Sequence, residues 1–313
     1  MTQATRAIWR IRSVGFSVAI AEPWKVSLHG GHSGDFCAHG HDTLREMLDA
    51  AVSFGYSTFG VTAHSAAVDP KFLYEEEVEA GLGVDDLAQT FRDYASTCAE
   101  LVTEYSDRIE VLVGAEVEIV PESSFADQAA KLKQDFHLDY LVGSVHWVDE
   151  MPFDTTSGDF EKAVANRGGL EPFVLRYFQL ISEMIDRVKP EVIGHFDLPR
   201  LFSDGAPELE SSAVKSAVAS TLEKASAAGS ILDLNVGSLA KGLSTPYPAP
   251  WIVRLATDIG VPFCFGDDSH SIAQVGAGLV EGREYLLANG VESITSLKRE
   301  SGTIVKTTMP LSR

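Results

Sequence analysis

Short runs of apolar residues recur along the chain and alternate with longer stretches in which apolar residues repeat at helical spacing. A short continuous apolar run is typical of a strand buried on both faces, whereas the longer period is typical of a helix. We expect seven strands, at Val26 and at residues 57–62, 109–115, 138–145, 191–194, 231–234 and 261–265. Helices are expected between them, including residues 87–105, 173–188, 213–228 and 251–259.

The clearest local signal is a helix between Asp42 and Gly55. Thr43 and Glu46 have the spacing of a capping box, in which each side chain satisfies a backbone N–H group at the start of the helix. Apolar residues then repeat at helical spacing until Gly55, which is a typical stop signal.

Repeated strand and helix units predict an α/β fold with a parallel sheet covered by helices. An open doubly wound sheet and a closed barrel both fit this pattern. Polar candidate ligands follow nearly every expected strand, and only a ring of strand ends would bring them all to one point. We therefore predict a TIM-like (β/α)7 barrel. Residues 65–84 and 147–170, the longest irregular stretches, should cover the site as loops.

The chain has 313 residues, which is normal for a single barrel domain. We expect one domain over residues 26–313 and an N-terminal extension over residues 1–25. Three arginines precede an apolar segment at residues 14–21, but Gly15 and Ser17 interrupt it. An extension is therefore favoured over a signal peptide.

Composition excludes several classes of partner. Hydrophobic residues make up 45% of the chain and charged residues 22%, with no apolar stretch long enough to cross a bilayer. The formal net charge of −20 argues against binding to a nucleic acid backbone. Bound metal ions could still attract a small phosphate ester to an acidic protein.

The cysteines favour a cytoplasmic location. Cys37, Cys98 and Cys264 form no CxxC pair, which fits a reducing compartment better than a disulfide scaffold. Cys37 lies near candidate ligands in the sequence and could be a soft metal ligand. We favour the alternative, in which it is a small buried hydrophobic residue.

Seven of the nine histidines lie at or just beyond the ends of the expected strands, as do two carboxylates. The candidate metal ligands are His29, His32, His39, His64, Glu116, His146, His195, Asp268 and His270. Imidazole nitrogen and carboxylate oxygen together suit Zn, Fe or Mn. Because nine ligands exceed the needs of one ion, we predict two or three divalent ions and a hydrolytic function.

The first two histidines have an unusual spacing. Side chains of a regular strand share a face at i and i+2, so His29 and His32 would point apart. A bulge at Gly30 and Gly31 could absorb the extra residue. Further along, either His39 or His41 could complete a third metal position, and we choose His39.

The carboxylates suggest how several ions could be joined. Glu116 ends a buried strand, where a carboxylate is costly without a cation partner, and its two oxygens could bridge two ions. Asp268 and His270 are two residues apart and can share a face while binding different ions. Asp267 should point elsewhere.

In order and context, these residues resemble the polymerase and histidinol phosphatase (PHP) family, specifically its histidinol-phosphate phosphatase branch. The resemblance runs from about Ser27 to Ser271 and includes residues 143–147, 194–198 and 247–250. It implies a distorted seven-stranded β/α barrel with three metals, whose bridging hydroxide attacks phosphorus. The implied reaction converts L-histidinol phosphate and water to L-histidinol and phosphate.

The resemblance also suggests which residues act on the substrate. Glu116, Asp268 and Arg200 are the expected catalytic residues, with Arg200 matching a basic position of the branch. Arg200 could instead be an arginine held in an ion pair. Trp147 could stack on an aromatic substrate, although packing beneath a loop is favoured.

Several positions depart from the family pattern. The first motif is HxxH rather than HxH, Ala63 stands in place of a usual Asp, and Asp267 in place of a usual Ser. Ala240 stands where the branch tends to carry Arg. Lys241 could bind the phosphate in its place, as a point charge without the bidentate fork of arginine.

Three other functions are compatible with parts of the pattern. One is a PHP phosphoesterase acting on another small ester or a nucleotide. Another is an amidohydrolase, although that class typically places a bridging lysine after strand four, where this chain has His146. The third is a metal-binding regulatory module without turnover.

Overall fold

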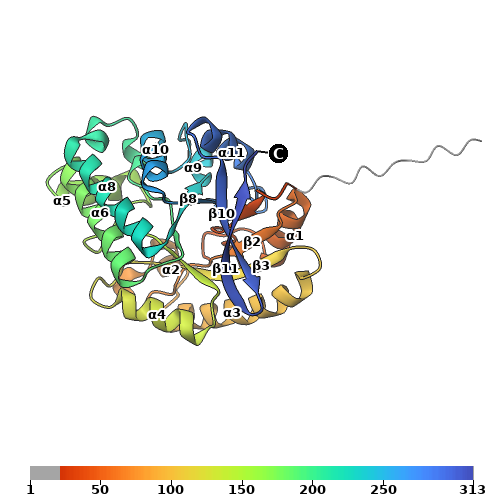
Figure 1. The fold of residues 1–313 in the computed structure, drawn as a ribbon. Coiled ribbons are helices and arrows are strands. Elements are labelled where there is room, and N and C mark those ends of the chain that lie inside the picture. Colours follow the sequence, from red (N-terminus) through yellow and green to blue (C-terminus); the bar gives the residue numbers. More distant parts are fainter. Residues whose placement is uncertain (1–21, 313) are drawn as a thin grey trace, which may run out of the picture.

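The computed structural model describes residues 22–312, and its centre is a ring of seven parallel strands (Figure 1). The strands are β1 (Val26–Ser27), β2 (Thr58–Val61), β3 (Glu110–Val117), β4 (Tyr140–Gly143), β7 (Val192–Ile193), β8 (Ile231–Asn235) and β9 (Phe263–Gly266). They pair in this order, each parallel to the next. Beside them, the Leu28 amide donates to the Phe265 carbonyl at 2.8 Å and joins the two ends of the sheet. The predicted distorted (β/α)7 barrel is therefore confirmed.

Helices surround the ring (Figure 1). The longer ones are α1 (Leu44–Phe54), α3 (Val84–Tyr105), α4 (Phe125–Asp135), α6 (Leu170–Arg187), α8 (Ser212–Ala228), α10 (Pro250–Ile259) and α11 (Leu279–Ala288). Another ten-residue helix is α5 (Ser157–Asn166). Short helical segments are η1 (Pro70–Phe72), α2 (Glu75–Glu79), α7 (Arg200–Ser203), η2 (Pro207–Glu210) and α9 (Gly237–Ala240).

The capped helix predicted from the sequence is α1. Thr43 accepts a hydrogen bond from the Glu46 amide, and the Glu46 carboxylate accepts one from the Thr43 amide in return. Gly55 ends the helix in the left-handed conformation, with φ of 90°.

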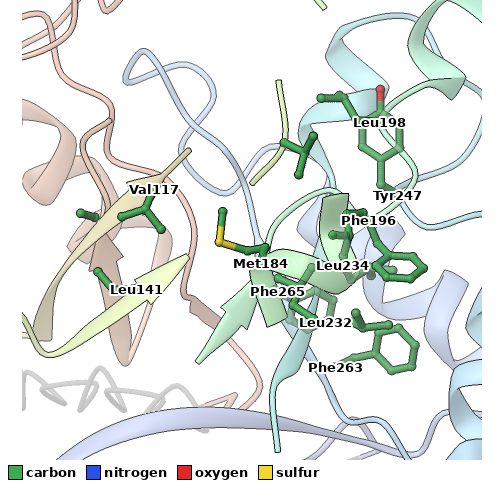
Figure 2. Packing of buried hydrophobic residues seen from close by; sticks show 14 of the residues in the cluster. Val117, Leu141, Met184, Phe196, Leu198, Leu232, Leu234, Tyr247, Phe263 and Phe265 are labelled. Atoms are coloured by element: carbon green, nitrogen blue, oxygen red, sulfur yellow. The ribbon is translucent and has the colours of Figure 1, made fainter. Parts of the chain in front are cut away.

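Two hydrophobic layers hold the barrel together. The inner layer consists of Leu28, Leu112, Tyr140, Val142, Val192, Ile231 and Cys264, together with Leu297. The outer layer fills the space between the strands and the helices. Figure 2 shows part of it, where Leu232 and Leu234 of β8 lie beside Phe263 and Phe265 of β9. Side chains buried on both faces explain why the strands are continuously apolar.

A C-terminal hairpin, which the sequence analysis does not predict, covers one end of the barrel (Figure 1). It consists of β10 (Ser293–Glu300) and β11 (Thr303–Pro310), paired antiparallel. Leu297 of β10 reaches the inner layer, and the Arg299 amide donates to Glu110 at 2.7 Å. Arg299 also pairs with Asp139, just before β4. The hairpin therefore closes the amino end of the strands and leaves the carboxyl end open.

The two long stretches predicted as irregular are partly ordered, so that prediction is wrong in part. Residues 65–84 contain η1 and α2, while residues 147–170 contain α5 and the small hairpin of β5 (Trp147–Val148) and β6 (Met151–Pro152). Apart from α5, which has ten residues, each of these segments is too short for a clear period in the sequence. Both stretches do border the cavity at the carboxyl end of the barrel, through Tyr74 and Asp154 among others.

The last residues of the expected extension belong to the folded unit. Trp24 is 4% exposed and packs against Phe265, with ring centroids 6.2 Å apart. The arginines and the apolar segment at residues 14–21 lie outside the described residues. Within residues 22–312, no helix is both long and apolar enough to cross a membrane.

Candidate metal centre

The carboxyl ends of the strands bring the candidate ligands together. His29 and His32 follow β1, His64 follows β2, Glu116 lies in β3, His146 follows β4, His195 follows β7, and Asp268 and His270 follow β9. His39 comes from the loop that leads into α1. Seven of these nine residues line one cavity of about 210 Å³, and the other two, His29 and His32, are completely buried.

Glu116 lies at the centre of this cluster and is almost completely buried. Its Oε1 atom is 3.1 Å from His195 Nε2 and 3.3 Å from His29 Nε2. Its Oε2 atom is 3.2 Å from His64 Nδ1 and 3.7 Å from His32 Nε2. Each carboxylate oxygen thus faces a different set of imidazoles, which is the arrangement that a bridging ligand requires.

Asp268 approaches the cluster from the opposite side of the ring. Its Oδ1 atom is 3.6 Å from His32 Nε2 and 3.9 Å from His29 Nε2. Its Oδ2 atom accepts a hydrogen bond from Asn235 at 3.4 Å and lies 3.7 Å from Lys241 Nζ. One oxygen is thus directed at the histidines, and the other is held by groups of the chain.

A third group lies nearer to solvent. The His39 ring stacks on His270 with centroids 4.7 Å apart, and its Nδ1 atom is 3.1 Å from Glu76 Oε1. His39, His64, His270 and Cys37 have donor atoms within 4.8 Å of one another. His41, the alternative to His39, is exposed and belongs to none of the ligand groups found in the described part of the chain.

The donor atoms form three further groups that could each hold an ion. These are His29, His32 and Asp268; His29, Glu116 and His195; and His32, His64 and Glu116. His29, His32 and Glu116 each occur in two groups. Glu116 has two oxygens and can serve both of its groups, whereas an imidazole nitrogen can bind only one ion. His146 joins the second group, because its Nε2 atom is 3.0 Å from His195 Nε2 and 3.5 Å from Glu116 Oε1.

Two glycines make the unusual HxxH spacing possible. Gly31 has φ of 72°, and a side chain at Gly30 would collide with Asp267. The loop is tied to the one after β9, because the His29 carbonyl accepts from the Asp268 amide at 2.9 Å and the His32 amide donates to Ser269 at 2.9 Å. The extra residue is absorbed in this loop, and both imidazoles face the cluster.

Asp267 points away from the cluster, as its position beside Asp268 suggests. Its Oδ2 atom accepts from the Tyr56 hydroxyl at 2.8 Å and from the Gly276 amide at 2.9 Å. It therefore fastens the loop after β9 to the barrel.

Two further carboxylates, which the sequence analysis missed, hold histidine rings from behind. Asp233 of β8 lies 2.8 Å from His29 Nδ1 through its Oδ2 atom, and Glu118 pairs with His146 Nδ1. A carboxylate at Nδ1 fixes the tautomer and leaves Nε2 free to bind a metal. For Asp233, the signal in the sequence is a charged residue in a buried apolar strand, which is costly unless it has a partner.

The cluster has donor atoms without partners, as a metal site requires. Among the described residues, buried ring nitrogens without a hydrogen-bond partner are His29 Nε2, His32 Nδ1 and Nε2, His64 Nδ1 and Nε2, His195 Nδ1 and His270 Nε2. Buried polar atoms normally have partners, so this many exceptions in one place fit a site that binds cations.

The protonation states of His32, His64 and Glu116 suit metal binding. Despite burial, the surrounding carboxylates hold the pKa of His29 well above its ordinary value and raise the pKa of His146 to about 10, so a metal ion must displace a proton from each of these rings. Burial lowers the pKa of His64 to about 3 and holds the pKa of His32 well below its ordinary value, so both rings are neutral. Burial alone would raise the pKa of Glu116, but His29 and His64 hold it well below the ordinary range. Neutral imidazole and ionised carboxylate are the forms that bind metal.

Of the expected substrate residues, only Lys241 lines the cavity. Trp147 is buried against Phe72 and Tyr74, with ring centroids 5.5 and 5.8 Å away, and borders a neighbouring apolar groove instead. Trp147 therefore packs beneath a loop, which is the role that the sequence analysis favoured over stacking on a substrate.

The structure does not place Arg200 at the cavity. The guanidinium is buried, with Nε donating to Asp204 at 2.9 Å and Nη2 to Thr245 at 2.7 Å. Its Nη1 group donates to the Pro246 carbonyl at 3.0 Å and lies 3.4 Å from Asp197. Every nitrogen of the guanidinium has a partner within the chain. Arg200 is therefore held in an ion pair, which was the alternative expectation, and does not reach the cavity as a phosphate contact.

The fold and the site define a class of protein. The PHP domain matches residues 29–236, and the chain belongs to this family.

Relatives of known name are similar over most of the chain. The Schizosaccharomyces pombe protein named "Probable histidinol-phosphatase" is 33% identical over 289 residues, covering 90% of this chain and 93% of the relative. The Saccharomyces cerevisiae protein named "Histidinol-phosphatase" is 30% identical over 293 residues, with 83% and 87% covered.

A solved structure has the same fold. It is the Lactococcus lactis histidinol phosphate phosphatase complexed with zinc, L-histidinol and phosphate. The TM-score is 0.65 at 15% identity, and the match covers 90% of this chain and 99% of that one.

Proposed function

We propose that this protein is a metal-dependent phosphomonoesterase that hydrolyses L-histidinol phosphate to L-histidinol and phosphate. The observation that carries the proposal is the buried carboxylate of Glu116 between two sets of imidazoles whose ring nitrogens lack partners. The names of the relatives, which extend over most of the chain, support this substrate.

The proposed ligand set is the nine residues expected from the sequence. Glu116, His146 and His195 would surround one divalent ion, and His29, His32, Glu116 and Asp268 a second. His39, His64 and His270 would hold a third. Zinc, iron and manganese all suit this mixture of nitrogen and oxygen ligands, and the zinc in the Lactococcus lactis structure agrees with it.

Divalent ions at these positions would lower the pKa of bound water and neutralise charge on the phosphoryl oxygens. The chain provides their arrangement. Asp233 and Glu118 hold His29 and His146 with Nε2 directed inward. Glu116 and Asp268 provide negative charge that keeps several cations close together.

Lys241 is the proposed phosphate-binding side chain. Its ammonium lies 3.7 Å from Asp268 Oδ2, and the side chain is 42% exposed, so it can reach a ligand in the cavity. The phosphoryl group gathers negative charge on its oxygens in the transition state, and a lysine at the wall can stabilise that charge.

The test is phosphate release from a panel of esters by metal-loaded protein. L-Histidinol phosphate should have the highest kcat/KM, and chelation should abolish turnover. A higher kcat/KM for another phosphomonoester or a nucleotide would show that L-histidinol phosphate is not the substrate, but the protein would still be a metal-dependent phosphoesterase. Stable metal content without release from any ester would indicate the metal-binding module, and hydrolysis of amides alone would indicate an amidohydrolase.

A further inference from the structure

One carboxylate at the cavity has no role in the proposed metal centre. Four acidic side chains line the cavity: Glu76, Glu116, Asp154 and Asp268. Glu76 bonds to His39, while Glu116 and Asp268 face the histidines. Asp154 forms no hydrogen bond with any part of the chain that the structure describes, and its nearest charged partner is His146 Nε2, at 4.0 Å.

Asp154 is held in place by its neighbours rather than by its own side chain. On one side, Phe153 is completely buried, and its amide donates to the His146 carbonyl at 3.1 Å. On the other side, Thr156 caps α5 by accepting from the Asp159 amide at 3.1 Å. The backbone on both sides is anchored, so the carboxylate is preorganised at the cavity wall.

The surroundings suggest a positively charged ligand for Asp154. Its side chain is 21% exposed, so a ligand in the cavity can reach it. It belongs to none of the groups of donor atoms that could share an ion within residues 22–312. Lys241, the cation at the cavity wall, lies against Asp268 instead. A carboxylate at a partly enclosed site that makes no hydrogen bond within residues 22–312, and only a 4.0 Å contact with His146, is a strong acceptor for an ammonium group.

We propose that Asp154 binds the ammonium group of an amino-alcohol phosphate and so selects this substrate class over amine-free esters. The inference rests on the proposed function and deepens it. In such an ester an oxygen and two carbons separate phosphorus from the ammonium nitrogen. With the phosphoryl group at the metal centre, the ammonium would lie within reach of Asp154, which is next to the His146 ring.

The kinetic test compares two esters that differ only in the amine: L-histidinol phosphate and 3-(imidazol-4-yl)propyl phosphate. Asp154→Asn should lower kcat/KM for the amine-bearing ester by about 10- to 100-fold, the size of a lost charged hydrogen bond. Most of the loss should be in KM. For the amine-free ester, kcat/KM should stay within about twofold, since no ammonium is present to lose its partner.

A matched control removes a charge nearby without touching the cavity. Glu161 lies exposed on α5, and Glu161→Gln should leave kcat/KM unchanged for both esters. Equal losses on both esters in Asp154→Asn would overturn the inference, because Asp154 would then act in metal binding or in proton transfer. The absence of any loss would overturn it as well.

Measuring the binding of the product alcohol tests this inference independently of the proposed function. Titration calorimetry on metal-loaded protein should show that Asp154→Asn lowers the affinity for L-histidinol but leaves the affinity for 3-(imidazol-4-yl)propan-1-ol unchanged. If the wild type released no phosphate from any ester, the proposed function would fail, yet this difference in binding would still support ammonium recognition. Equal affinities of wild type and variant for L-histidinol would overturn it.

Discussion

Asp233 Oδ2 lies 2.8 Å from His29 Nδ1, and both side chains are completely buried. The same oxygen accepts a hydrogen bond from Asn235 Nδ2 at 3.0 Å, so the carboxylate is held by two groups. The contact forces the proton of His29 onto Nδ1 and leaves Nε2 directed at Glu116 and Asp268. Strand β8 thus sets the orientation of a ring that belongs to the loop after β1.

Asp233→Asn should therefore weaken metal binding. An amide can donate to Nδ1, which would move the ring proton to Nε2 and remove a ligand atom. We expect metal affinity to fall by about 10- to 100-fold, measured by competition with a coloured chelator. Circular dichroism should show an intact fold, and unchanged affinity would mean that Asp233 does not orient the ligand.

Gly31→Ala should damage the metal centre as well as the fold. A methyl group there would lie 3.0 Å from Val61 Cγ1 and 3.3 Å from Phe59 Cε1, and the φ of 72° is strained for alanine. We expect a loss of about 2 kcal/mol or more in the free energy of unfolding, together with a lower metal content.

Gly81 offers a matched control, because it has the same φ of 72° but no atom within 4 Å of the added methyl group. Gly81→Ala should cost about 1 kcal/mol in urea denaturation and leave the metal content unchanged. Equal effects of the two substitutions would show that the close approach at Gly31 does not matter.

Leu297→Ala tests whether the C-terminal hairpin closes the barrel. The side chain is 1% exposed and belongs to the inner layer, so its removal should cost about 2–5 kcal/mol in the free energy of unfolding. Metal content should be unaffected, because the hairpin lies at the opposite end of the strands. Lys298→Ala, at the exposed neighbouring position, should change stability little.

Lys241 and Arg200 should respond differently to loss of charge. Lys241→Met should weaken inhibition by inorganic phosphate by about tenfold and leave the thermal midpoint nearly unchanged, because the side chain is half exposed. Arg200→Met should leave phosphate inhibition unchanged but cost about 3 kcal/mol, since Asp197 would remain buried without its partner. Weaker phosphate inhibition in Arg200→Met, with no change in inhibition in Lys241→Met, would instead identify Arg200 as the phosphate contact.

The sequence was sufficient to predict the elements that carry strong local signals. The capping box of α1 and the apolar runs of the barrel strands depend only on neighbouring residues, and each is confirmed. The hairpin β10–β11 also has a signal in the sequence, the Ser301-Gly302 pair between the two strands. In the structure these residues have φ of 51° and 81°, as in a tight hairpin turn.

The remaining features depend on distant residues. Helix α2 is five residues long and mostly acidic, so no period marks it. Asp197 and Asp204, two partners of Arg200, are its neighbours in the sequence, but Thr245 and Pro246, which occupy the rest of the guanidinium, approach from a separate loop. Asp154 lies in a stretch without a motif, and only the folded chain shows that it borders the cavity.

The central claim is that one cluster of imidazoles and carboxylates holds the metal ions. Crystals grown with zinc and measured on both sides of the zinc absorption edge would test it most directly. We expect one anomalous peak between Glu116, Asp268 and the Nε2 atoms of His29 and His32, a second near Glu116, His146 and His195, and a third near His39, His64 and His270. Zinc bound only elsewhere on the chain, with these side chains free of metal, would contradict it.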